Sequence, residues 1–137
     1  VKADEREKNS RMLLNLGHTF AHAIEKALNY RVKHGEAVSL GLLMATRLSI
    51  LLGKTNTNNF KLVEGHLRKF SLPTNLNCLS PKKKWNSNSI IKNMLLDKKR
   101  DNENIKFILL NDIGKAFIEN NVSKLKINKT IQEFINV

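Results

Sequence analysis

The segment from Ala37 to Leu52 constrains the fold most, because it is apolar on most of the circumference of the helix that it predicts. A helix of this kind must be buried on several sides, so other elements have to pack around it. Four polar residues interrupt the segment: Ser39, Thr46, Arg47 and Ser49. The segment therefore falls short of the roughly 18 apolar residues that a membrane span needs. We predict a core helix that begins at His34-Gly35-Glu36 and is stopped by Gly53, with no membrane anchor.

Helical spacing of apolar residues predicts further helices on both sides of this segment. The first starts at or just after Gly17, because glycine in a helix interior costs about 1 kcal/mol relative to alanine, and it ends near Asn29-Tyr30. A third helix is predicted over Asn58 to Phe70, a short one over Ile90 to Leu96, and a last one over Lys126 to Val137. In the third helix three residues are expected to point inward: Leu62, Leu67 and Phe70.

The remaining segments predict irregular structure and one hairpin. Residues 73–85, rich in Pro, Asn and Lys, are expected to form a loop. Two β-rich runs, 106–110 and 116–118, flank the turn at 111–114 and predict a small hairpin. We therefore expect residues 1–137 to form a single, mainly α, multi-helix domain of five or six helices with a small β-hairpin.

The chain is strongly basic, with a formal net charge of +12, of which +9 falls in residues 54–137. Such a charge attracts anions, whether nucleic acid, phosphorylated metabolites or acidic lipid, but a composition rich in Lys, Asn and Ile gives it without any partner. Cys78 is the single cysteine, so no internal disulfide forms and a reducing, cytoplasmic location is expected. The chain opens with Val1 and no signal-peptide pattern, so we expect it to begin partway through a longer protein.

Three of the four histidines fall within seventeen residues: His18, His22 and His34. His18 and His22 are four residues apart, so a helix projects both rings from one face, where they could bind one divalent metal ion. By spacing alone these two are the first choice of ligands, and a turn back of the chain would bring His34 beside His18. The alternative is that all three are hydrogen-bonded histidines at helix ends.

A zinc-type site needs at least three protein ligands. The third would be Glu36, Glu25 or a residue outside this chain. His18 is followed by Thr19, so the glutamate of a metalloprotease HExxH helix is missing.

Arg11 and Asn15 precede His18 by seven and four residues, so a continuous helix would place them along the same side. A guanidinium, an amide and imidazoles on one apolar-backed surface form a recess for an oxygen-rich anion. The alternative is a polar helix face in water. The cluster Asp97-Lys98-Lys99-Arg100 also suits phosphate, although such charge runs are usually solvated surface.

Five segments carry a resemblance to 3-dehydroquinate synthase. Arg11 to Glu25, RMLLNLGHTFAHAIE, closely resembles the signature of that family, and His34 to Ala45, HGEAVSLGLLMA, is similar to the segment that follows it. Ala3 to Glu7, Met94 to Lys99 and Phe107 to Lys115 resemble the family in the same order. The resemblance covers nearly the whole chain, which makes it far more specific than any single spacing.

The resemblance implies the C-terminal domain of a phosphate-eliminating lyase and cyclase. The family uses NAD and a divalent metal, zinc or cobalt, to convert 3-deoxy-D-arabino-heptulosonate 7-phosphate to 3-dehydroquinate and phosphate, the second step of the shikimate pathway to aromatic amino acids. It also implies a homodimer. No glycine-rich dinucleotide fingerprint occurs among the six glycines. NAD is therefore expected to bind an N-terminal domain that is absent from this chain, and this chain alone is expected to be inactive.

The resemblance also assigns metal-site roles. His18 and His34 match metal ligands, with a glutamate of the N-terminal half as the third, and this overrules the choice made from spacing. His22 matches a residue that faces the substrate and, with Glu7, moves protons. Ala21 departs from the pattern, because the family commonly has glycine there.

Further matched positions would bind the substrate. Arg11 and Asn15 match substrate-binding residues, and Lys98 or Lys99 matches a lysine that contacts the anionic end of the substrate. Two other functions stay open. One is another sugar-phosphate cyclase, such as a 2-deoxy-scyllo-inosose synthase. The second is a basic helical nucleic-acid-binding module, although the chain lacks an aromatic stacking platform.

Overall fold

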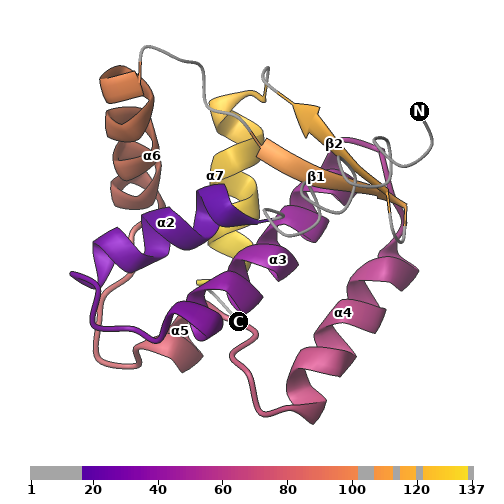
Figure 1. Cartoon of the computed structure of the whole chain (residues 1–137), viewed down its shortest axis with the longest axis horizontal. Coiled ribbons are helices and arrows are strands. Elements are labelled where there is room, and N and C mark those ends of the chain that lie inside the picture. Colours follow the sequence, from indigo (N-terminus) through magenta and orange to yellow (C-terminus); the bar gives the residue numbers. More distant parts are fainter. Residues whose placement is uncertain (1–16, 102–106, 113–114, 120–121, 136–137) are drawn as a thin grey trace, which may run out of the picture.

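The computed structural model describes residues 17–101, 107–112, 115–119 and 122–135, which form six helices and one two-stranded antiparallel sheet (Figure 1). The mainly α class with a small hairpin is confirmed. The elements are α2 (His18–Ala27), α3 (His34–Leu51), α4 (Thr57–Lys69), α5 (Leu76–Leu79), α6 (Ser87–Asp101), β1 (Phe107–Asp112), β2 (Lys115–Glu119) and α7 (Lys124–Glu133).

Helix α3 is the centre of the fold, as its apolar circumference predicts. It packs against α2, α4, α7 and β1, and four of its large side chains are fully buried: Leu40, Leu43, Met44 and Leu48. Two of its polar residues are fully buried as well. The hydroxyls of Thr46 and Ser49 donate to the carbonyl oxygens one turn earlier, 2.9 and 2.8 Å away, so neither side chain is left without a partner.

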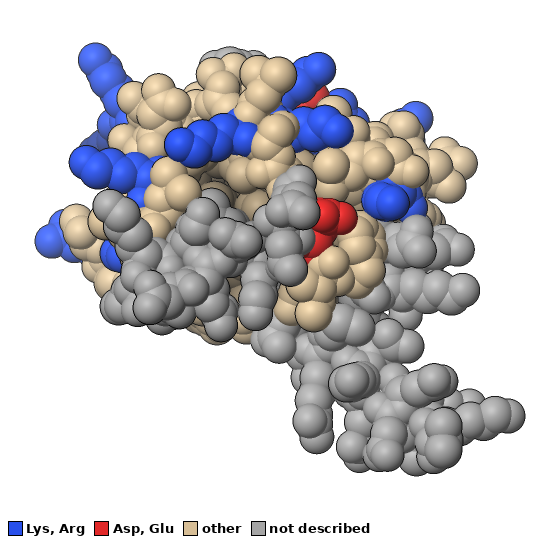
Figure 2. All heavy atoms as spheres, turned by 90° about the horizontal axis from the view of Figure 1, so that it is seen from above, with Lys and Arg blue, Asp and Glu red and all other residues tan. Residues whose placement is uncertain are grey.

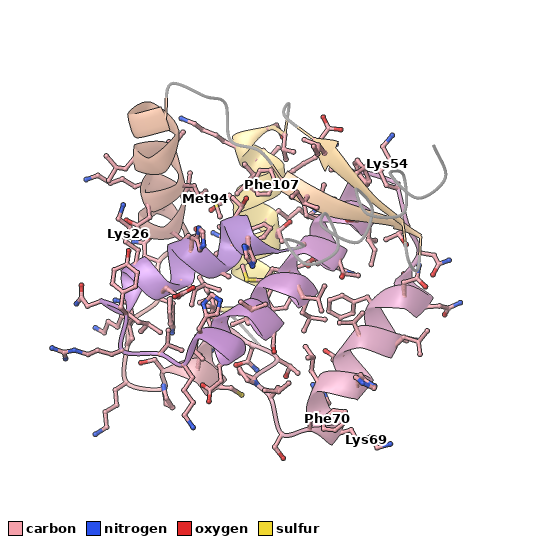
Figure 3. The ribbon with its side chains drawn as sticks, viewed as in Figure 1. Lys26, Lys54, Lys69, Phe70, Met94 and Phe107 are labelled. Atoms are coloured by element: carbon pink, nitrogen blue, oxygen red, sulfur yellow. The ribbon has the colours of Figure 1, made fainter. Side chains whose placement is uncertain are left out.

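The hairpin and α6 complete the core around α2 and α3. Phe107 of β1 packs against Phe20 of α2 with ring centroids 5.3 Å apart, and Met94 of α6 is buried beside them in the same cluster. Figure 3 shows Met94 and Phe107 close together between α6 and the hairpin. The strands pair with Leu109 opposite Phe117, and the register shifts between Leu110 and Asp112, so the predicted hairpin is confirmed with an irregularity next to its turn.

The predicted inward face of α4 is wrong for two of its three residues. Leu67 is buried, but Leu62 and Phe70 are each 61% exposed, and Figure 3 shows Phe70 at the outer end of α4. The packed face is formed instead by Phe60, Val63 and Leu67, which recur at helical spacing. Phe60 decides this orientation, because its ring lies 6.3 Å from that of Phe134 at the end of α7.

The loop predicted at residues 73–85 is wrong in part, because it contains the short helix α5. Asn75 caps this helix by accepting from the amide of Cys78 at 2.7 Å, and Leu76 is fully buried. The amide of Leu76 donates to the carbonyl of Phe134 at 2.9 Å. A helix is present where the last one is predicted, but it spans Lys124 to Glu133 and not Lys126 to Val137, and it follows the cap residue Ser123. The short helix predicted at 90–96 is longer, from Ser87 to Asp101.

Arg47, the one cationic residue in the core helix, is tied to α7. Its guanidinium forms a paired contact with the carboxylate of Glu133, with Nη2 donating to Oε1 at 3.0 Å and Nε to Oε2. This hydrogen bonding raises the pKa of Arg47 above its usual value. The guanidinium also lies 5.7 Å from the ring centroid of Phe60, so α3, α4 and α7 meet at one side chain.

Helices α2 and α3 touch through their backbones at two glycines. Gly17 has a φ of +79°, which favours glycine, and a Cβ on Gly17 would collide with the backbone of Gly41 and Leu42. A Cβ on Gly41 would collide in turn with the carbonyl oxygen of Gly17 and lie 3.0 Å from the amide of Ala21. Ala21 itself is fully buried, so its methyl group is accommodated next to this crossing.

The crossing predicts a large loss of stability for Gly41→Ala. The added methyl group has to push α2 away from α3, and overpacking of this kind costs about 1–3 kcal/mol or more. Chemical denaturation of the two proteins measures the difference. Gly65→Ala is the matched control, because Gly65 lies inside α4 with nothing within 4 Å of an added Cβ. The control is expected to be stabilised by about 0.5–1 kcal/mol, and a Gly41→Ala protein as stable as the original would contradict the crossing.

Candidate functional site

Three histidine rings gather between the N-terminal half of α2 and the start of α3. The centroid of His18 lies 5.4 Å from that of His22 and 6.3 Å from that of His34. His18 is the first residue of α2, directly after Gly17, and His22 follows one turn later on the same face. His34 is the first residue of α3. The turn back that sequence reasoning required for His34 is therefore present.

The connection between the two helices is short and uses an uncommon backbone conformation. Asn29 and Tyr30 follow the end of α2 with φ values of +52° and +60°. The amide of Tyr30 donates to the carbonyl of Glu25 at 2.8 Å, which closes the end of the helix. The chain then reverses, and α3 runs back across α2 (Figure 1). The ring of His34 thereby comes within 6.3 Å of that of His18.

Glu25 stands next to this cluster and makes a direct contact with it. Its Oε1 lies 3.1 Å from Nδ1 of His34. The two side chains differ in burial: that of His34 is 64% exposed and that of Glu25 is 14% exposed. Sequence reasoning named Glu25 as a possible metal ligand but did not predict its pairing with His34. Spacing does indicate that Glu25 lies near the cluster, because Glu25 is seven residues after His18 and three after His22, on the same face of α2.

The surroundings favour the neutral form of His18. The pKa of His18 is lowered from its usual value, first by partial burial and then by the neighbouring His22 and His34, against a smaller opposing effect of Glu25. A metal ion binds the neutral imidazole, so a lowered pKa means that protons compete less for the ring. The cluster is therefore electrostatically suited to a cation that replaces the protons.

The residues present fit part of a divalent metal site. Imidazole nitrogen binds zinc at about 2.0–2.1 Å. The rings of His18 and His22 already have a separation that suits one tetrahedral ion, whereas those of His18 and His34 would have to move slightly closer to share it. Among the described residues no group of three His, Cys, Asp or Glu side chains is arranged to hold a metal.

The other predicted site residues are only partly placed. Glu7, Arg11 and Asn15 lie outside the described residues. Lys98 and Lys99 belong to the C-terminal end of α6, which packs against α2, but their side chains also lie outside the described set.

Glu36, the other candidate ligand, lines two surface hollows. One also includes Arg31 and Lys83, the other Arg68 and Cys78, and neither includes a histidine of the cluster. Among the described residues, Glu25 is thus the candidate acidic ligand that contacts the cluster.

The basic surface does not gather into one groove on the face that Figure 2 shows. There the described Lys and Arg side chains are scattered among uncharged residues, with a small acidic patch between them. None of the described helices is long and apolar enough to cross a membrane, in agreement with the prediction for the core helix.

Residues 1–100 match the model of a protein family described as 3-dehydroquinate synthase C-terminal. The 3-dehydroquinate synthase of Vesicomyosocius okutanii is 44% identical over 135 residues, which are 98% of this chain and 36% of that relative. The enzyme of the same name from Pelagibacter ubique is 44% identical over 138 residues, and that of Campylobacter jejuni is 39% identical over 135. The chain thus spans just over a third of the length of these relatives.

Solved structures share the fold. A 2-epi-5-epi-valiolone synthase from Streptomyces hygroscopicus, with NAD+ and Zn2+ bound, superposes with a TM-score of 0.73 at 22% identity, over 89% of this chain and 32% of that one. A 2-deoxy-scyllo-inosose synthase in complex with carbaglucose-6-phosphate, NAD+ and Co2+ gives a TM-score of 0.67 at 27% identity, over 88% and 33%.

The proximity of the three rings predicts that the His22→Gln substitution raises the pKa of His18. The substitution removes a neighbour whose positive charge opposes protonation of His18. Titration of the histidine signals by NMR measures the change, and His34→Gln is expected to act in the same direction. His66→Gln is the control, because His66 lies on α4 against Phe70, with ring centroids 5.1 Å apart. An unchanged His18 pKa in both test variants would show that the rings do not share one site.

Proposed function

The chain belongs to the 3-dehydroquinate synthase family, and from this premise we propose that it is the metal- and substrate-binding part of an enzyme that forms 3-dehydroquinate and phosphate from 3-deoxy-D-arabino-heptulosonate 7-phosphate. The observation that carries the proposal is the cluster of His18, His22 and His34. These rings lie inside the segment that matches the family, on the two helices that form the centre of the fold.

In this proposal His18 and His34 bind a divalent metal, zinc or cobalt, together with a glutamate of the N-terminal domain. The lowered pKa of His18 supports such a role, because protons then compete less with a metal for the ring. The pairing of His34 with Glu25 supports it as well, because it holds an otherwise exposed ring in one place. A bound metal of this kind polarises alcohol and ketone oxygens of the substrate.

The remaining residues of the proposed site bind the substrate and move its protons. His22 lies one turn after His18 and so faces the same space, where a ring with a free nitrogen accepts or donates a proton, in concert with Glu7. Arg11, Asn15 and one of Lys98 and Lys99 bind the phosphate and carboxylate groups, for which guanidinium, amide and ammonium groups are suited.

We assign NAD binding mainly to the N-terminal domain of the same enzyme. The two solved neighbours are complexes with NAD+ and either Zn2+ or Co2+, and this chain matches about a third of each. The chain itself has no glycine-rich dinucleotide fingerprint. The proposed enzyme is a cytoplasmic homodimer in which the histidine cluster faces the NAD-binding domain.

Two other functions receive less support. A 2-deoxy-scyllo-inosose synthase shares the fold at 27% identity, whereas relatives named 3-dehydroquinate synthase are about 40% identical over nearly the whole chain. A nucleic-acid-binding role rests on charge alone, and that charge is scattered on the face in Figure 2.

The proposed activity predicts that the chain works only beside an NAD-binding domain. The chain alone, supplied with substrate, NAD and zinc, is expected to release phosphate at background rate. In a hybrid, the chain replaces the matching segment of the Vesicomyosocius okutanii enzyme. This hybrid is expected to release phosphate from 3-deoxy-D-arabino-heptulosonate 7-phosphate faster than from the substrate of 2-deoxy-scyllo-inosose synthase. The same hybrid with His18→Ala is the inactive control. Turnover by the chain alone would refute the dependence, and a hybrid that binds NAD but releases no phosphate would refute the activity.

The ligand assignment makes a separate prediction for metal binding. His18→Ala and His34→Ala should each lower the affinity of the chain for Co2+ by at least on the order of 100-fold, because loss of a hydrogen-bonding partner of a ligand already costs about 10–100-fold. His22→Ala should change it much less. Titration followed by the visible absorption of Co2+ measures the affinities. A chain in which His22→Ala weakens binding and His34→Ala does not would restore the pair chosen from spacing.

A further inference from the structure

We propose that Glu25 is a positioning residue, whose carboxylate accepts the hydrogen of Nδ1 of His34 and so keeps Nε2 of that ring free to bind the metal. This inference rests on the proposed function, in which His34 is a metal ligand. It assigns a role to a residue of this chain that the resemblance leaves without one.

The first observation is the contact itself. Oε1 of Glu25 lies 3.1 Å from Nδ1 of His34, and the two residues come from different helices. The ring of His34 is 64% exposed, so packing alone does not fix its orientation. The carboxylate is therefore the group that holds the ring, and it does so from a side chain that is itself only 14% exposed.

The second step follows from the chemistry of the two groups. An ionised carboxylate only accepts hydrogen bonds, so the hydrogen in this contact has to belong to Nδ1. A neutral imidazole carries a single ring hydrogen, and with that hydrogen on Nδ1 the other nitrogen, Nε2, has a free electron pair. A carboxylate that accepts from a ligating histidine also raises the basicity of the ligand, and its loss typically lowers metal affinity about 10–100-fold.

The alternative is that Glu25 binds the metal directly as the third ligand. Its sequence position does not decide between the two roles, because it lies on the same face of α2 as His18 and His22. Replacing Glu25 by glutamine does decide between the two roles. The amide oxygen of glutamine still accepts the hydrogen bond from Nδ1, but the amide is uncharged and therefore a poor metal ligand. Glu25→Gln therefore preserves a positioning role and removes a ligand role.

The experiment uses the whole chain and four proteins: unmodified, Glu25→Ala, Glu25→Gln and the control Glu36→Ala. Glu36 is the matched control, because it carries the same side chain as Glu25 and lies two residues after His34. It lines surface hollows and has no described bond to a histidine. NMR of the ring nitrogens reports the tautomer of His34 in the metal-free chain, and Co2+ titration reports the affinity. Circular dichroism establishes that each variant is folded.

The unmodified chain is expected to show His34 with its hydrogen on Nδ1. Glu25→Ala should reduce the share of this tautomer and weaken Co2+ binding about 10–100-fold, Glu25→Gln should restore most of both, and Glu36→Ala should change neither.

The proposal is overturned if His34 in the unmodified chain carries its hydrogen on Nε2, a result that needs no variant to fold. It is also overturned if Glu25→Gln binds Co2+ as weakly as Glu25→Ala while the tautomer is unchanged, because Glu25 is then a ligand. The tautomer is read without metal, so it is independent of the proposed function. If His34→Ala leaves the Co2+ affinity unchanged, His34 is not a metal ligand and the proposed function fails at this residue. The hydrogen bond between Glu25 and His34 is tested separately, by the tautomer of His34 in the metal-free chain.

Discussion

The backbone contact between Gly17 and Gly41 is the constraint on which the rest of the site depends. Side chains at either position would hold α2 and α3 apart, since each Cβ would fall on the backbone of the other helix. The contact fixes the residue directly before His18 against Gly41, about two turns after His34, the first residue of α3. A small displacement at the crossing would therefore change the distance between the two rings as well as the packing of the core.

Periodicity predicted the elements whose burial is decided by their own sequence. Helix α3 is apolar on most of its circumference and is buried on several sides. Helix α2 begins directly after Gly17, as expected from the cost of a glycine inside a helix. The exposed Leu62 on α4 and the helix α5 were not predictable in this way. The face of α4 is chosen by Phe134, and Leu76 is held by a backbone bond to the same residue, more than fifty positions later.

The sequence predicted which residues form the histidine cluster better than it predicted which side chains contact one another. Spacing places His18 and His22 on one face, but the approach of His34 depends on positive φ values at Asn29 and Tyr30, which hydrophobic periodicity does not encode. Family resemblance supplied that pairing without any geometry. The contact of Glu25 with His34 was missed because it joins two helices, and helical spacing relates only residues of the same helix.

A cation site in a chain of net charge +12 needs local features that oppose the overall field. Two are present at the cluster. The histidine at its centre, His18, has a lowered pKa, so it takes up a proton less readily than a free imidazole does. Glu25 adds a negative charge whose side chain is mostly shielded from water, where a charge acts more strongly than on the surface. The cluster therefore stays suited to a divalent cation although the chain as a whole is strongly basic.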